Sequence, residues 1–272
     1  MTRSPDWSET PWRPWHTCLQ GTAHRRDLRN CQDATAIREG TRLRPRSPVG
    51  DGRFVVGAVS DGVGSHRHAE IGARLTATIA VNIVTDALHR GRGPASIGEA
   101  LTTGLPARLG QLADLCRDEW TECCYATIVV AVGTVDWFAA WACGDGYLSV
   151  NGETPRVTGV LMRDRLPVDY RHTPGFDSEG RPRKAMLEKL VELPAREVAS
   201  AWIGTDGARY LTADGAPWKD HLGDPLADAP PVAAGWKSME QWGERHFSAL
   251  QAGMSSLRDD LGLVAFVPRD LR

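Results

Sequence analysis

The sequence predicts an α+β domain built on antiparallel sheets. Three observations lead to this class: short apolar runs of strand character, two consecutive segments with helical periodicity, and turn residues between the later strands. Residues 54–59 (Phe-Val-Val-Gly-Ala-Val) form the first clear run. Strands joined by hairpin-type turns, with the helices grouped together, favour an α+β domain over alternating βαβ units.

Helices are expected after this first strand. Apolar residues recur at near-helical spacing over 69–88 and again over 97–116. Gly104 and Pro106 interrupt the second pattern, so that helix could be broken in two. A further helix is expected around residues 184–190.

Strand character returns in the second half of the chain. Residues 126–132, 137–143 and 147–150 are separated by glycine-containing turns, which predicts an antiparallel meander. Strands are also expected at 199–204 and 261–267. The segment 236–257 between them is predicted to be helical.

Composition narrows the class of protein. The chain has 272 residues and a formal net charge of −2, unlike the strongly basic surface of a nucleic-acid-binding protein. No apolar run approaches the ~20 residues of a membrane span, and residues 1–15 lack the apolar core of a secretory signal. The six cysteines form no CxxC pair. We therefore expect a cytoplasmic protein that binds neither nucleic acid nor membrane, with an N-terminal arm (1–15) and one domain (16–269).

Aspartates recur where the apolar strands begin or end. These residues are Asp33, Asp61, Asp145, Asp206, Asp259 and Asp260. Carboxylate and carbonyl oxygens are the ligands that Mg²⁺ and Mn²⁺ prefer. Several aspartates brought to one end of a sheet would bind two such ions ~3.5–4 Å apart, and these could activate a water against a phosphate ester.

A simpler interpretation exists for each Asp-Gly pair. Asp-Gly is a common turn dipeptide, and a lone one is more often a turn than a ligand. For Asp145 the turn is the stronger interpretation. Spacing alone leaves both alternatives open for the others.

The chain also carries an ordered series of short motifs between residues 18 and 267. They are Gly21-Thr22-Ala23-His24, Asn30-Cys31-Gln32-Asp33-Ala34, residues 55–64, Ile71-Gly72-Ala73, residues 126–130, Ala142-Cys143-Gly144-Asp145-Gly146, Ile203-Gly204-Thr205-Asp206-Gly207 and Asp259-Asp260-Leu261-Gly262-Leu263. As a set they resemble the metal-dependent serine/threonine phosphatases of the protein phosphatase 2C type, especially their bacterial branch.

The resemblance implies a four-layer α-β-β-α sandwich: two antiparallel sheets flanked by helix pairs, with 16–269 as the catalytic domain. It implies hydrolysis of phosphoserine or phosphothreonine by a water activated by two Mn²⁺ or Mg²⁺ ions, with a third ion as an option. A phosphoprotein substrate and a cognate Ser/Thr kinase are the partners that it suggests.

Site residues follow from the resemblance position by position. Asp61 would bridge both ions, and the Gly62 carbonyl would bind one of them. Asp206 and Asp259 would complete the carboxylate set of the other ion. Asp33 would act on the ion pair directly or through a water.

The substrate phosphate would be held by an arginine a few residues before the first aspartate. Arg29 is the nearest match, one residue closer to Asp33 than the family spacing. Arg25 and Arg26 are alternatives for this role.

Two other positions depart from the family pattern. Gln32 stands where many relatives have Glu, and Val63 stands where eukaryotic members often have His. The general acid is therefore unassigned, with His24 and His66 as candidates. These departures keep a second hypothesis open, a catalytically weak or silent module that binds a phosphoprotein or kinase. A phosphodiesterase-type two-metal hydrolase is a third hypothesis, disfavoured because the eight histidines are scattered.

Overall fold

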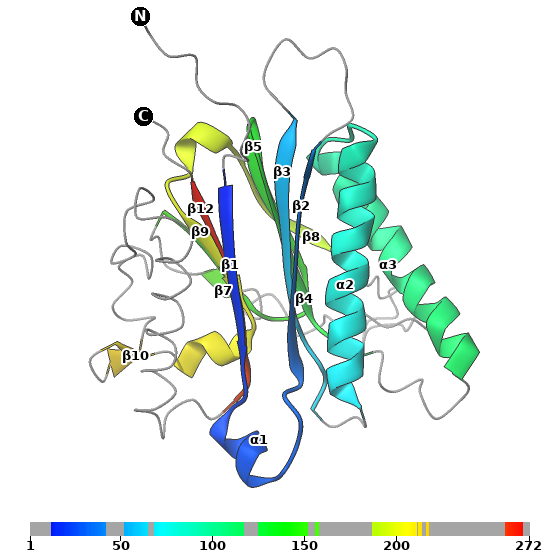
Figure 1. Ribbon diagram of the computed structural model, residues 1–272, viewed down its shortest axis with the longest axis vertical. Coiled ribbons are helices and arrows are strands. Elements are labelled where there is room, and N and C mark those ends of the chain that lie inside the picture. The colour runs from blue at the N-terminus through cyan, green and yellow to red at the C-terminus, as the bar shows by residue number, and fades with distance from the viewer. Residues whose placement is uncertain are drawn as a thin grey trace, which may run out of the picture.

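The computed structural model describes two five-stranded antiparallel sheets packed face to face (Figure 1). It covers residues 12–41, 52–64, 68–116, 125–151, 156–157, 187–210, 212–213, 216–217 and 259–268, and the statements below concern these residues. In strand order the first sheet contains β1 (Trp12–Leu19), β12 (Leu261–Pro268), β9 (Ala201–Gly204), β6 (Tyr147–Val150) and β7 (Arg156–Val157). The second contains β2 (Asp33–Thr41), β3 (Arg53–Asp61), β4 (Ile128–Thr134), β5 (Trp137–Cys143) and β8 (Glu188–Pro194).

Helices cover the outer face of the second sheet (Figure 1). They are α2 (Ala69–His89) and α3 (Pro94–Cys116). The smaller elements are α1 (Thr22–Arg26), η3 (Ala195–Glu197), η4 (Asp206–Tyr210) and the hairpin of β10 (Thr212–Ala213) and β11 (Ala216–Pro217). The two antiparallel sheets of the predicted sandwich are confirmed. Its second helix pair, including the helix expected at 236–257, lies outside the described residues.

The uninterrupted apolar run in β3 follows from burial on both faces. Val55 and Val59 point into the core between the sheets, where they join Val264 and Phe266 of β12. Alternate residues such as Val56 pack under the helices instead. A strand between two apolar layers needs no polar face, because side chains alternate from one face to the other.

The helix α2 is long and apolar enough, by length and composition, to cross a membrane, the one such helix among those described. Its most apolar window is 61% buried inside the domain. Buried residues such as Ala73, Ala77 and Val84 pack on the sheet. Burial against the sheet accounts for its apolar composition.

The predicted meander is wrong in its third strand. β4 and β5 form a hairpin, with Ile128 opposite Cys143. β6 then crosses to the other sheet and pairs with β9. The crossover lies at Gly144 and Gly146, whose φ angles of 92° and 150° suit glycine.

The prediction of a helix at 184–190 is also wrong for the residues of this range that the structure describes. Residues from Glu188 onward form β8, an edge strand paired with β5. Leu190, Val191 and Leu193 pack against the core between the sheets. Tertiary pairing with β5 therefore overrides the local helical pattern.

α3 is continuous, and Pro106 lies inside it. Leu101, Leu105 and Leu109 are fully buried on the same helix face. Packing of this stripe holds the helix together across the proline.

The tryptophans of β1 lie within the predicted N-terminal arm. Trp12 is 1% exposed, and its Nε1 donates a hydrogen bond to the Thr134 carbonyl at 2.8 Å. The first sheet thus begins before residue 16, and the boundary placed there stays a prediction.

Candidate functional site

The candidate site lies where four strand ends meet at one end of the sandwich, beside α1 (Figure 1). In the second sheet, Asp33 at the start of β2 pairs directly with Asp61 at the end of β3. In the first sheet, β9 ends beside the start of β12, with Gly204 opposite Leu263. Antiparallel pairing thus brings together segments that are far apart in the sequence.

Asp33 joins the two sheets. Its side chain is 4% exposed, and its Oδ2 accepts hydrogen bonds from Thr205 Oγ1 at 2.5 Å and from the Gly262 amide at 2.9 Å. Burial and then the charge of Asp61 raise the pKa of Asp33, although the Thr205 hydrogen bond opposes them. The structure therefore holds this carboxyl rigidly beside Asp61.

Asp61 faces several other carboxylates. Burial raises its pKa to about 8. The charges of Asp206, Asp145 and Asp259 add to the shift, and a hydrogen bond with Asp33 opposes it. The backbone is held by Thr127, whose amide donates to the Asp61 carbonyl at 2.8 Å and whose Oγ1 accepts from the Asp61 amide at 3.2 Å. Three other aspartates identified in the sequence thus act on Asp61, including Asp145, for which a turn was the preferred interpretation.

Two glycines after these aspartates are required by close backbone contacts. A Cβ on Gly62 would lie 2.3 Å from the Ala69 carbonyl oxygen at the start of α2. A Cβ on Gly207 would lie 1.7 Å from the Asp260 carbonyl oxygen. The Asp-Gly pairs therefore allow tight packing around the carboxylates.

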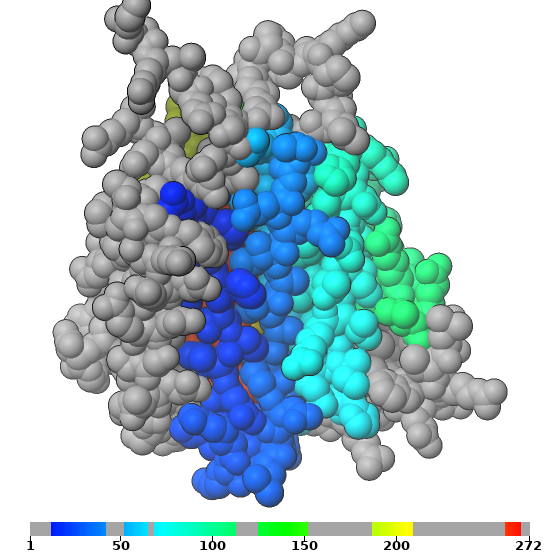
Figure 2. All heavy atoms as spheres, viewed as in Figure 1, coloured from blue at the N-terminus to red at the C-terminus, as the bar shows by residue number. Residues whose placement is uncertain are grey.

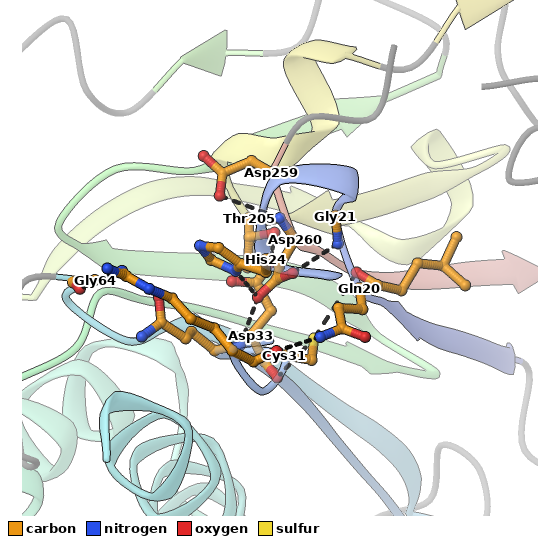
Figure 3. A network of polar contacts seen from close by, with 12 residues as sticks. Gln20, Gly21, His24, Cys31, Asp33, Gly64, Thr205, Asp259 and Asp260 are labelled. Carbon is orange, nitrogen blue, oxygen red and sulfur yellow. Dashed lines mark hydrogen bonds and ion pairs between the residues drawn. The ribbon is translucent and has the colours of Figure 1, made fainter. Parts of the chain in front are cut away.

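Asp260 was noticed in the sequence but given no role, and the structure assigns it one (Figure 3). Its carboxylate is buried and accepts from the Gly21 amide at 2.7 Å, the Gln32 amide at 2.5 Å and His24 Nδ1 at 2.7 Å. One carboxylate thus joins the segments before α1 and before β2 to the start of β12. The sequence did offer a signal for this role. Asp259 and Asp260 are adjacent and precede a buried strand, so one of the two side chains had to point inward.

Thr205 is the second residue that sequence reasoning missed. Besides donating to Asp33, its Oγ1 accepts from the Gly262 amide at 2.8 Å. The sequence shows only that a threonine lies between the end of a strand and Asp206. Such a threonine is too common to indicate a role.

Arg29 reaches the segment that follows Asp61. Its Nη1 donates to the Gly64 carbonyl at 3.3 Å, and the side chain of Gln20 donates to the Arg29 carbonyl. Arg29 is exposed, as are Arg25 and Arg26 on the same loop. The structure thus brings Arg29 to the edge of the site. His66 lies outside the described residues.

Hard divalent cations suit this donor set by its chemistry. The side chains are carboxylates and the nearby backbone offers carbonyl oxygens, which are the oxygen ligands that Mg²⁺ and Mn²⁺ take. A bound cation would also relieve the repulsion that raises the Asp61 pKa. Within the described ranges, no three His, Cys, Asp or Glu side chains are placed closely enough to hold one ion.

Comparison with solved structures supports the same fold at low sequence identity. A bacterial serine phosphatase matches with a TM-score of 0.57 and 11% identity, covering 97% of this chain and 100% of that one. Stp1 of Staphylococcus aureus matches with a TM-score of 0.55 and 10% identity, covering 97% and 96%. PstP/Ppp of Mycobacterium tuberculosis matches with a TM-score of 0.55 and 14% identity, covering 95% and 99%.

The family is shown by a sequence model. No curated protein matches the chain. The family model described as "Protein phosphatase 2C" matches residues 20–251. This range includes the start of β2 and the ends of β3 and β9. The chain therefore belongs to the protein phosphatase 2C family.

Proposed function

We propose that this chain is an active protein serine/threonine phosphatase that depends on Mn²⁺ or Mg²⁺. The observation that carries the proposal is the convergence of Asp33, Asp61, Asp206 and Asp259 at one end of the sandwich, in a member of this family. The catalytic domain of PstP, which has the same fold (TM-score 0.51), has a crystal structure in complex with two manganese ions.

Each residue has a role in this proposal. Asp61, Asp206, Asp259 and the Gly62 carbonyl would hold two metal ions. When bound, the ions would supply an activated water and neutralise charge on the phosphate. Asp33 is held by the first sheet through Thr205 and would orient the water or a metal ligand.

Substrate binding falls to the loop around α1. Arg29 would pair with the phosphate of a phosphoserine or phosphothreonine, because its guanidinium is exposed beside the segment that follows Asp61. His24 donates through Nδ1 to buried Asp260, which favours a positioning role over that of general acid. A phosphoprotein substrate, a partner Ser/Thr kinase and a cytoplasmic location complete the proposal.

Asp61→Asn tests the proposal. Hydrolysis of p-nitrophenyl phosphate and of a phosphothreonine peptide is measured across a Mn²⁺ titration. We expect kcat/KM to fall on the order of 10³-fold, since the variant loses a charged metal ligand. Far-UV circular dichroism checks that the variant folds.

Asp136→Asn is the matched control. Asp136 is exposed in the β4–β5 turn, at the opposite end of the second sheet, and its substitution should leave turnover unchanged. Full turnover in Asp61→Asn would refute the proposed centre. Mn²⁺ binding to the wild-type chain without any turnover would instead favour the silent binding module.

A further inference from the structure

Two thiols meet at the base of the loop that contains α1. Cys18 lies near the end of β1 and Cys31 lies just before β2, with 3.4 Å between their sulfur atoms. Both sulfurs also donate to the Asp33 carbonyl, at 3.2 Å from Cys18 and 3.8 Å from Cys31. A disulfide is ~2.05 Å long, so a movement of little more than ~1 Å would join them.

An oxidant can reach these sulfurs. Cys18 is exposed, whereas Cys143 is buried in the core. Cys18 and Cys31 line a cavity of about 480 Å³ together with Asp33, Arg74 and others. The elements that form this cavity, β1, β2 and α2, follow one another across the face shown in Figure 2.

A bond here would close the base of a loop that contacts the candidate site. We call residues 19–30 the α1 loop. It carries Gly21 and His24, which bond Asp260, and Arg29, which bonds Gly64 (Figure 3). No residue of α1 itself is buried, so few apolar contacts hold the loop in place.

We propose that Cys18 and Cys31 form a reversible disulfide that restrains the α1 loop. The exposed Cys18 thiol gives two electrons to a hydroperoxide, forming a sulfenic acid and releasing water from hydrogen peroxide. The Cys31 sulfur then attacks the Cys18 sulfur. The S–O bond breaks, a second water leaves, and the S–S bond forms. A dithiol such as dithiothreitol reverses the reaction and becomes a disulfide itself.

Peptide mapping of the full chain tests the bond without any metal or substrate. The protein is treated with hydrogen peroxide, its free thiols are alkylated, and it is digested without reductant. We expect the peptides of Cys18 and Cys31 to be linked, and dithiothreitol to separate them. Recovery of both residues as alkylated thiols, or linkage of Cys18 to another cysteine, would overturn the proposal.

Serine variants sharpen this test. Cys18→Ser and Cys31→Ser should each abolish the linked peptide, whereas the matched control Cys143→Ser should keep it. Should a variant fail to fold, the wild-type map still decides the question. Asp61→Asn should form the same bond, so failure of the phosphatase proposal would leave this result unaffected.

Limited proteolysis tests the restraint on the loop. Trypsin can cleave after Arg25 and Arg26, which are exposed on the α1 loop. Oxidation should slow these two cleavages roughly threefold, because the closed base limits local opening. Equal cleavage rates in linked and reduced protein would show that the bond does not restrain the loop.

Discussion

Asp260 and Asp61 lie at the same end of the sandwich, yet their surroundings are opposite. Asp260 accepts hydrogen bonds from two backbone amides and His24. Asp61 instead faces the carboxylates of Asp206, Asp145 and Asp259, and its pKa is raised to about 8. The carboxylate of Asp260 is satisfied by donors of the protein, whereas a hydrogen bond with Asp33 offsets only part of the repulsion at Asp61.

The contrast separates a structural role from a binding role. A buried carboxylate with several donors stabilises the fold, because its charge is compensated inside the protein. Carboxylates that face one another destabilise the folded chain until a cation joins them. The predictions below test this distinction from the largest expected effect to the smallest.

Asp260→Asn should lower the free energy of unfolding by about 3 kcal/mol. The NH₂ group of the new asparagine would face one of the N–H donors that now bind the carboxylate, and that buried donor would lose its acceptor. Urea denaturation measures the loss. The control Asp27→Asn removes a carboxylate that is exposed and paired with exposed Arg26, and it should cost less than about 0.5 kcal/mol. Equal losses in the two variants would contradict the structural role of Asp260.

Asp61 should make the metal-free protein less stable as pH rises. Its pKa is about 8 in the folded chain against 3.8 for a solvated aspartate, so the folded state holds a proton that the unfolded state releases. The free energy of unfolding should therefore fall by ~2 kcal/mol between pH 6.5 and pH 8.5 and level off above that. Urea denaturation in a chelator across this range measures it.

Two comparisons isolate the Asp61 contribution. Asp61→Asn should flatten the pH dependence, whereas Asp136→Asn should keep it. Saturating Mn²⁺ at pH 8 should restore stability in the wild-type chain, by ~2.7 kcal/mol at a hundredfold excess over Kd. A wild-type chain that gains stability toward pH 8 without metal would contradict the account of these carboxylates.

Thr205→Val should cost about 1.5 kcal/mol in urea denaturation. The variant keeps the shape of the side chain but removes a hydrogen bond to Asp33 and an acceptor for the Gly262 amide. Thr205→Ser keeps the hydroxyl and is the matched control, with a smaller loss expected. A valine variant as stable as the serine variant would show that this hydroxyl does not stabilise the link between the sheets.

Arg29→Ala should raise KM for a phosphothreonine peptide about fivefold and change kcat little, because the proposed role is phosphate binding. Steady-state kinetics with Mn²⁺ measures both constants. Arg26→Ala is the control, since Arg26 is exposed on the same loop but pairs with Asp27. An equal rise in KM for both variants would point to general attraction by the loop's charge.

Much of the fold was predictable because its signals are local. The apolar run ending at Asp61 and the helical periodicity of α2 depend on neighbouring residues, and both were predicted correctly. Glu188–Pro194 was not, because its strand character comes from pairing with β5 and not from its own pattern. The meander failed for a similar reason: a Gly-Asp-Gly turn permits both a hairpin and a crossover between sheets.

The sequence by itself determined the family, the strand that ends at Asp61, the strands next to Asp206 and Asp259, and the preference of this donor set for a hard cation. Only the tertiary structure decided which acids are compensated and which face one another. That choice depends on strand register and on the contact between the sheets, which bring Asp260 to the amides of Gly21 and Gln32 across more than 200 residues of chain. The charge of an aspartate is local, but the donors and charges around it come from every strand end that meets there.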